Sequence, residues 1–167
     1  METTPRGVVI SEVAAAGPRL DALRELLREY LLGEAARVAA RGSEAELANL
    51  PGSYASPAGC VLLAELGGRA AGCIALRPLG DGRCEMKRLY VRAAFRGAGL
   101  AGLLVERIVA CAQSRGYEEM YLDTLPEMRA ARLMYDMLGF RPCAPYLAEP
   151  TPGADCMVLD LNALGAP

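Results

Sequence analysis

The 167-residue sequence contains no histidine, and its six cysteines include no Cys-x-x-Cys pair. Histidines and paired cysteines are the usual ligands of structural zinc, so a structural zinc site is not expected. Cysteines that are spread singly are typical of small core residues in a reducing compartment. We therefore expect no metal site and a chain whose cysteines are free thiols.

An excess of basic charge and a long apolar run are also missing. Lys plus Arg number 18 against 20 for Asp plus Glu, which leaves a net charge of -2 and no electrostatic footprint for nucleic acid or an anionic membrane. The N-terminal "METTPRG" lacks the features of a signal peptide, and the most apolar run, "LAGLLVERIVACA", is interrupted by Glu106 and Arg107. We expect a cytoplasmic protein with neither nucleic acid nor membrane as a partner.

What is present suits one globular domain over residues 1–167, because 53% of the residues are hydrophobic. Period-2 patterns and helical spacing predict strands and helices in alternation. The expected strands are 7–13, two within 60–78 joined by Gly67-Gly68, 83–92, 118–124, 140–143 and 156–161, and the expected helices follow Pro18 and cover 99–114 and 127–138. Residues 41–59 are expected to form a loop with one helical turn. This order predicts an α/β fold of the α+β type, with a mixed sheet flanked by helices.

A glycine-rich loop carries the first functional signal. Gly97, Gly99 and Gly102 spell G-x-G-x-x-G after Arg96, at the start of an expected helix. Glycines let backbone N–H groups turn toward an anion, and the helix end and the guanidinium add positive charge. We interpret the loop as a pyrophosphate cradle. A plain turn into the helix is the alternative, and the dinucleotide site of an oxidoreductase, with Asp123 as its acidic residue, is another.

The neighbouring motifs resemble those of the GNAT superfamily of N-acetyltransferases. "LYVRAAFRGAGLAGLLVERIVACAQSRGYEEMYLDT" is followed by "RAARLMYDMLGF", as in that family's order of strand, R/Q-x-x-G-x-G/A loop, helix, strand and A-x-x-L/M-Y-x-x-x-G-F segment. The resemblance is strong over residues 84–143 and loose over the rest of the chain. It implies a GNAT-like acyl-CoA N-acyltransferase fold with a mostly antiparallel central sheet, and acetyl-CoA as the cofactor. It also implies that the strand ending at Val91 diverges from strand 118–124 and leaves a slot for the pantetheine arm.

The resemblance assigns the cofactor contacts residue by residue. The pyrophosphate is expected against Arg96, Gly97, Ala98, Gly99, Leu100 and Ala101, the pantetheine and thioester along the backbone of Leu89, Tyr90 and Val91, and a further pantetheine contact at Thr124. One position departs from the family pattern. Met128 stands where an asparagine is often found, so one side-chain contact to the cofactor is expected to be missing.

Acetyl transfer to an amine requires a base for the amine and a proton for the departing thiolate. Since histidine is absent, a carboxylate is the available base, and Glu85 is the candidate. Strand alternation puts Glu85 on the face of Leu89 and Val91, together with Lys87. The alternative is a solvated residue paired with Lys87 or Arg83.

Tyr135 falls at helical spacing with Ala131, Met134 and Leu138, so its ring is expected to face inward. By itself this spacing indicates a core tyrosine. With the family pattern, Tyr135 becomes the candidate general acid toward the coenzyme A sulfur.

The expected acceptor is the primary amine of a small molecule or a peptide. The first helix, residues 41–58 and the loop "YLAEPTPGAD" are expected to wall its site, where charged or polar residues are available to a cationic amine: Glu34, Glu44, Glu46, Tyr54 and Glu149. No motif identifies the acceptor, and a homodimer remains open. A noncatalytic acyl-CoA sensor and a nucleotide-binding oxidoreductase module are the rival functions.

Overall fold

The computed structural model describes residues 7–33 and 43–165, and these contain one seven-stranded sheet. The strand order is β1-β2-β3-β4-β5-β7-β6. The strands are β1 (Val8–Glu12), β2 (Cys60–Leu66), β3 (Arg69–Gly80), β4 (Arg83–Val91), β5 (Glu119–Thr124), β6 (Arg141–Cys143) and β7 (Asp155–Asp160). Neighbouring strands are antiparallel except β4 and β5, which are parallel. The predicted mixed, mostly antiparallel sheet is confirmed.

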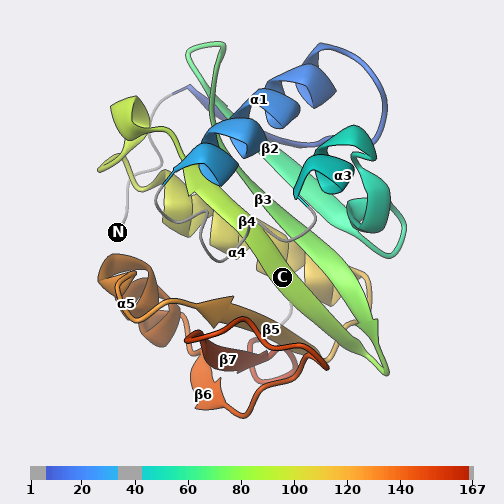
Figure 1. Ribbon diagram of the computed structural model, residues 1–167, viewed down its shortest axis with the longest axis vertical. Coiled ribbons are helices and arrows are strands. Elements are labelled where there is room, and N and C mark those ends of the chain that lie inside the picture. The colour runs from blue at the N-terminus through green and yellow to red at the C-terminus, as the bar shows by residue number, and fades with distance from the viewer. Residues whose placement is uncertain (1–6, 34–42, 166–167) are drawn as a thin grey trace.

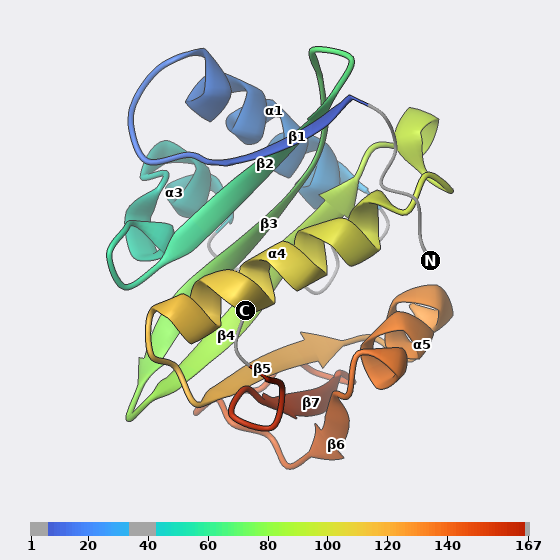
Figure 2. The same ribbon diagram turned by 180° about the vertical axis from the view of Figure 1, so that it is seen from behind.

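Helices cover both faces of this sheet. They are α1 (Pro18–Leu32), α3 (Ser43–Ala48), α4 (Leu100–Ser114) and α5 (Arg129–Met137), with short 3-10 helices η1 (Gly52–Tyr54) and η2 (Ala93–Phe95). Figure 1 shows α1 and α3 over one face, and Figure 2 shows α4 across the other. None of the helices within the described ranges is long and apolar enough to cross a membrane.

The two faces hold separate hydrophobic clusters, as the strand alternation requires. On β2, Val61 and Leu63 join the cluster that contains the α1 leucines, while Leu62 and Ala64 join the cluster that contains Ile108 of α4. α4 carries the chain from β4 back to β5, which is the crossover that parallel neighbours need. Its first residue therefore lies at the end of the sheet where β4 and β5 end.

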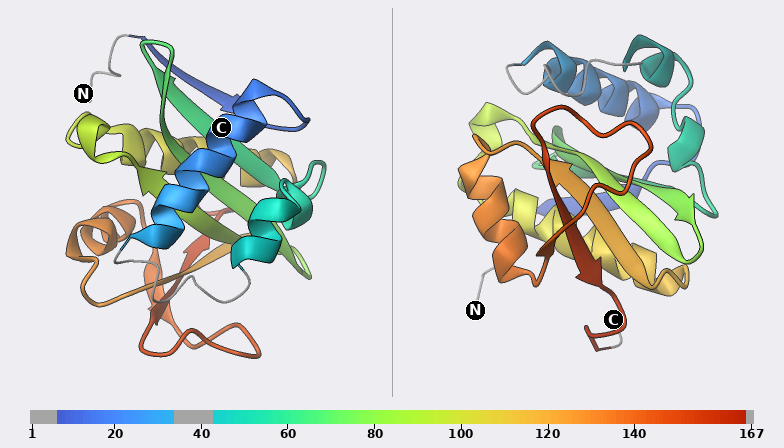
Figure 3. Two further views of the ribbon diagram at one scale, coloured as in Figure 1. Left: turned by 45° about the horizontal axis from the view of Figure 1, so that its top comes forward. Right: turned by 60° about the horizontal axis from the view of Figure 1, so that its bottom comes forward.

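Strands β4 and β5 pair over only part of their length. Three residue pairs make up their parallel ladder: Arg83 with Glu119, Cys84 with Met120 and Glu85 with Tyr121. The later residues of the two strands do not pair with each other. Figure 3 shows β5 diverging from β4, with α5 beyond its end. The predicted divergence is therefore confirmed, and the edges of β4 after Glu85 and β5 after Tyr121 face each other without strand hydrogen bonds.

A bulge in β4 changes which side chains share a face. Lys87 lies opposite Ala75 and Tyr90 opposite Cys73, so β4 holds one residue more than β3 in this interval. Arg88, within the bulge, has a left-handed φ of 61°. The prediction that Glu85 lies on the face of Leu89 and Val91 is therefore wrong. Those two residues pack into the cluster under α4, whereas Tyr90 packs into the α1 cluster.

Candidate active site

The glycine-rich loop forms an open turn at the start of α4. Gly97 and Gly99 have left-handed φ values of 80° and 74°, and a Cβ at either position would meet nothing within 4 Å. Within the described ranges, the backbone N–H groups of residues 97–102 donate to no backbone carbonyl of the turn. They lie at the positive end of a 15-residue helix. The loop therefore fits an anionic group such as a pyrophosphate, as the sequence predicts.

A groove runs from this loop to α5. Six of the predicted cofactor residues border it: Val91, Arg96, Gly97, Gly99, Leu100 and Ala101. The opposite wall includes Leu133 and Met137 of α5, whose exposed fractions are 62% and 81%. Large apolar side chains with this exposure are suited to covering a ligand. The guanidinium of Arg96 donates from Nε to the Val91 carbonyl at 3.0 Å.

Four predicted cofactor residues do not line this groove, and two of them, Leu89 and Thr124, line the second cavity described below. Ala98 belongs to the loop but is absent from the wall. Tyr90 points to the α1 face, where its ring packs against Tyr30 at 5.8 Å between centroids and its hydroxyl donates to Glu29 at 3.3 Å. The side chain of Tyr90 is therefore occupied, and only its backbone is available to a ligand between the strands.

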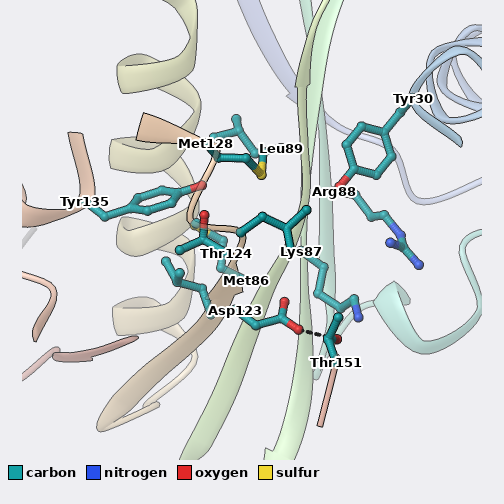
Figure 4. A pocket seen from close by; sticks show the side chains of 12 residues that line it. Tyr30, Met86, Lys87, Arg88, Leu89, Asp123, Thr124, Met128, Tyr135 and Thr151 are labelled. Carbon is teal, nitrogen blue, oxygen red and sulfur yellow. Dashed lines mark hydrogen bonds between the residues drawn. The ribbon is translucent and has the colours of Figure 1, made fainter. Parts of the chain in front are cut away.

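A second cavity, of about 80 Å³, lies between the diverging strands. On the face of α4 and α5 it is lined by Leu89, Leu122, Thr124, Met128 and Tyr135. On the face of α1 it is lined by Tyr30, Lys87, Arg88, Asp123 and Thr151. Figure 4 shows Tyr135 at one side of this space and Tyr30 at the other. The divergence of β4 from β5 thus joins the two faces of the sheet through one cavity.

Tyr135 and Thr124 form the polar part of the α5 side. Tyr135 is 6% exposed, its ring packs on Phe140, and its hydroxyl makes no hydrogen bond to a described residue. Burial raises the pKa of Tyr135 above its usual value, so the hydroxyl keeps its proton. Thr124 Oγ1 is buried and has no hydrogen-bond partner among the described residues. Buried polar atoms are rarely left unpaired, so Thr124 Oγ1 is suited to a bound ligand, and the free Tyr135 hydroxyl borders the same cavity.

Glu85 lies close to this cavity but does not line it. Its side chain is fully buried, and its carboxylate accepts hydrogen bonds from Arg77 Nε and from the Tyr146 hydroxyl at 2.9 Å. Lys87 Nζ lies 3.8 Å from Glu85 Oε1. Glu85 is thus not the solvated residue of the alternative interpretation, and Arg77, rather than Arg83, is its main partner. No sequence pattern indicates the contact of Tyr146 with Glu85, because Tyr146 lies in the loop before β7, far along the chain.

The other residues considered for the acceptor site have mixed outcomes. Glu46 accepts hydrogen bonds from Arg88, with Nε at 2.8 Å, and from the Tyr54 hydroxyl at 2.7 Å. Burial alone would raise the pKa of Glu46, but the Arg88 guanidinium outweighs it and lowers that pKa. Glu149 is exposed, and Glu34 lies outside the described residues. The charge of Glu46 is therefore balanced by Arg88, and Glu46 does not present an unpaired carboxylate to an amine.

The comparison with known families decides between the interpretations of this site. The model of the acetyltransferase (GNAT) family matches residues 20–140. The chain belongs to the GNAT acetyltransferase family. This GNAT domain is 39% identical over 145 residues to an uncharacterised N-acetyltransferase of Schizosaccharomyces pombe, with 86% of this chain and 89% of that protein covered.

Solved GNAT structures share the fold. An acetyltransferase from Streptococcus agalactiae aligns with a TM-score of 0.79 at 20% identity, covering 93% of this chain and 99% of that one. A GNAT acetyltransferase from Elizabethkingia anophelis, solved with acetyl-CoA bound, aligns with a TM-score of 0.66 at 19% identity over the same shares. This GNAT protein is an acetyl-CoA-dependent N-acetyltransferase. Family membership thus favours acetyl transfer over the two rival functions.

Proposed function

We propose that this enzyme moves an acetyl group directly to a primary amine of a small molecule or a peptide, within the cavity between β4 and β5. The observation that supports this proposal is the cavity itself, which joins the α5 face, with Tyr135, to the α1 face, with Lys87 and Asp123. A donor and an acceptor entering from opposite faces would meet there without a covalent enzyme intermediate.

The residues available for the donor fit acetyl-CoA. The open N–H groups of residues 97–102 would hold its pyrophosphate, the unpaired edge of β4 from Leu89 to Val91 its pantetheine, and Thr124 Oγ1 a further polar atom of that arm. When bound, acetyl-CoA supplies the acetyl group and leaves as a thiol. The Met128 side chain lines the cavity and has no hydrogen-bond donor, so it would contact the cofactor by packing alone.

Tyr135 is the proposed general acid. Transfer from a thioester to an ammonium releases two protons from nitrogen, one of which goes to sulfur and one to solvent. Tyr135 holds a proton on the α5 side of the cavity, and burial favours the neutral phenol there. Once it has protonated the sulfur, it regains a proton through water.

For the base, Glu85 remains the candidate, acting through water or through the Tyr146 hydroxyl that contacts it. Its two carboxylate oxygens already accept hydrogen bonds, one from Arg77 and one from Tyr146. Asp123 is the second carboxylate on this face, and it lines the cavity directly. Comparison of Glu85→Gln with Asp123→Asn separates the two, because only loss of the base should remove the acidic limb, along which activity falls as the base is protonated, from the pH profile of kcat/KM.

The test of the proposed function is an amine screen with purified protein, following thiol release from acetyl-CoA and identifying products by mass spectrometry. We expect an N-acetylated product with one thiol released per amide formed. Coenzyme A binding with no product from any amine would support the noncatalytic sensor instead. Binding of NAD without coenzyme A would support the oxidoreductase module.

A further inference from the structure

On the α1 face of the cavity, some charged side chains have a close partner of opposite charge and others do not. Arg88 is held by Glu46, and Arg77 is held by Glu85, each through charge-assisted hydrogen bonds. Lys87 and Asp123 remain, one from each of the diverging strands. Both line the cavity, and their side chains extend toward Thr151 in Figure 4.

Lys87 has no anion of its own among the described residues. Its Nζ makes no hydrogen bond there, and the one carboxylate within salt-bridge distance is Glu85 Oε1 at 3.8 Å, with Asp123 and Glu46 farther away. That carboxylate is already bound by Arg77 and Tyr146. The side chain of Lys87 is 21% exposed, and burial lowers the pKa of Lys87 although Glu85 opposes this effect. An ammonium in this setting has three unused donors, so a bound anion would stabilise it.

Lys87 is also the only lysine in the sequence, since every other basic residue is an arginine. Lysine differs from arginine in offering a compact point charge instead of a planar fork. In a cavity of about 80 Å³ the shorter head group leaves more room for a ligand. The choice of residue therefore suits contact with a small anionic group.

Asp123 presents the opposite charge. Its Oδ2 accepts a hydrogen bond from the Thr151 hydroxyl at 2.6 Å, and no arginine or lysine of the described ranges lies within salt-bridge distance of its carboxylate. The remaining oxygen is available to an N–H donor. A ligand that brought one charge only would leave either Lys87 or Asp123 uncompensated in a half-buried site, which is costly.

We propose that the acceptor is an α-amino acid, whose carboxylate contacts Lys87 and whose amine contacts Asp123. This proposal rests on the proposed acetyl transfer and names its substrate class. A zwitterion with amine and carboxylate on one carbon compensates both side chains at once. A peptide N-terminus or a simple amine lacks the adjacent carboxylate, so both are expected to be poor acceptors.

Matched acceptors test the proposal in the purified full chain. Each of the twenty amino acids is compared with its carboxamide, which has the same side chain and amine but no carboxylate. For the amino acid that reacts best, we expect kcat/KM to exceed that of its amide by about 10- to 100-fold, the usual range for one hydrogen bond to a charged group. Equal or faster turnover of the amides would overturn the proposal while leaving acetyl transfer established.

Two variants test whether Lys87 contacts the carboxylate of the acceptor. Lys87→Met keeps the length of the side chain and removes the charge, so the ratio of amino acid to amide should fall about 10- to 100-fold, mostly through KM. Arg107→Met removes a positive charge from the exposed face of α4 and should leave the ratio unchanged. A Lys87→Met enzyme that still prefers amino acids over amides by the full factor would overturn the role of Lys87.

A binding measurement keeps the proposal testable if no acceptor is turned over. Because Lys87 is the only lysine, its reaction with acetic anhydride is read from a single peptide by mass spectrometry. In the presence of coenzyme A, the amino acids should slow this modification and the amides should not. If none of the twenty amino acids protects Lys87, the proposal fails, whatever the outcome of the amine screen.

Discussion

The side chain of Tyr135 has one polar atom, its hydroxyl oxygen, which borders the cavity and has no hydrogen-bond partner among the described residues. Tyr135→Phe removes the hydroxyl and keeps the ring that packs on Phe140. Stability and coenzyme A affinity should change little, whereas kcat at pH 7 should fall by about a hundredfold to ten-thousandfold, the usual worth of a general acid. The measurement is steady-state kinetics on a confirmed acceptor.

The pH dependence separates an acid from a packing residue. Burial raises the pKa of Tyr135, so the wild-type hydroxyl stays protonated through the neutral range. A thiol has a pKa of about 8.5, so the departing sulfur needs less help as the pH approaches 9, and the defect of Tyr135→Phe should shrink there. Tyr117→Phe, which removes a hydroxyl bound to the Ala58 carbonyl elsewhere, is the control. Full activity of Tyr135→Phe at pH 7, with chemistry rate-limiting, would show that Tyr135 has only a packing role in the core.

At the scale of elements, we expect coenzyme A binding to depend on the turn that leads into α4. Gly99→Asp adds bulk and a negative charge where the structure leaves open space at a φ of 74°. We expect calorimetry to show no coenzyme A binding by this variant, because the aspartate repels the pyrophosphate and fills its site.

The matched control is Gly67→Asp in the β2–β3 turn. Gly67 also has a left-handed φ, of 59°, with nothing within 4 Å of an added Cβ. It therefore carries the same backbone strain without facing the groove. Normal coenzyme A affinity in a folded Gly99→Asp protein would rule out the cradle.

The contact between α3 and β4 gives a stability prediction. Glu46 of α3 binds Arg88, and the side chains are 22% and 7% exposed. Glu46→Gln should lower the free energy of unfolding by about 1–3 kcal/mol, measured by urea unfolding, because it leaves a buried guanidinium without its anion. The Glu46 pKa is lowered in the folded state, so this stabilisation is present above the unfolded pKa, near 4.5, and is lost as pH falls below it. A gap between wild type and Glu46→Gln that stays constant from pH 7 to pH 3 would contradict this account.

The same elements show what could be predicted from the sequence. Hydrophobic periodicity and turn glycines are local features of the sequence, so they predicted the strands and helices correctly. The divergence of β4 from β5 was predicted from the family resemblance. The bulge at Arg88 was missed, since an arginine with a left-handed φ carries no turn signal and is held by distant Glu46. The roles of Tyr146 and Thr151 depend on contacts with Glu85 and Asp123 across long stretches of chain, which no spacing reveals.

At the scale of the whole molecule, the sheet has two parts joined by a short ladder. β1 to β4 carry α1 and α4, while β5 to β7 carry α5, and the parallel register between the parts ends at Glu85 and Tyr121. The cofactor groove has walls from both parts, α4 on one side and α5 on the other. A ligand that fills the groove therefore contacts both parts of the sheet at once.

Coenzyme A should consequently raise the melting temperature of the entire chain. At a ligand concentration one hundred times Kd, binding to the folded state alone adds about 2.7 kcal/mol. For a chain of this size that corresponds to a shift of about 5–11 °C, and Gly99→Asp should show no shift while Gly67→Asp shows all of it. Hydrogen exchange should slow in β5 and α5 as well as in α4, because closing the groove must immobilise both of its walls. Slower exchange confined to α4 would mean that α5 does not contact the ligand, and the exposed Leu133 and Met137 would then need another partner.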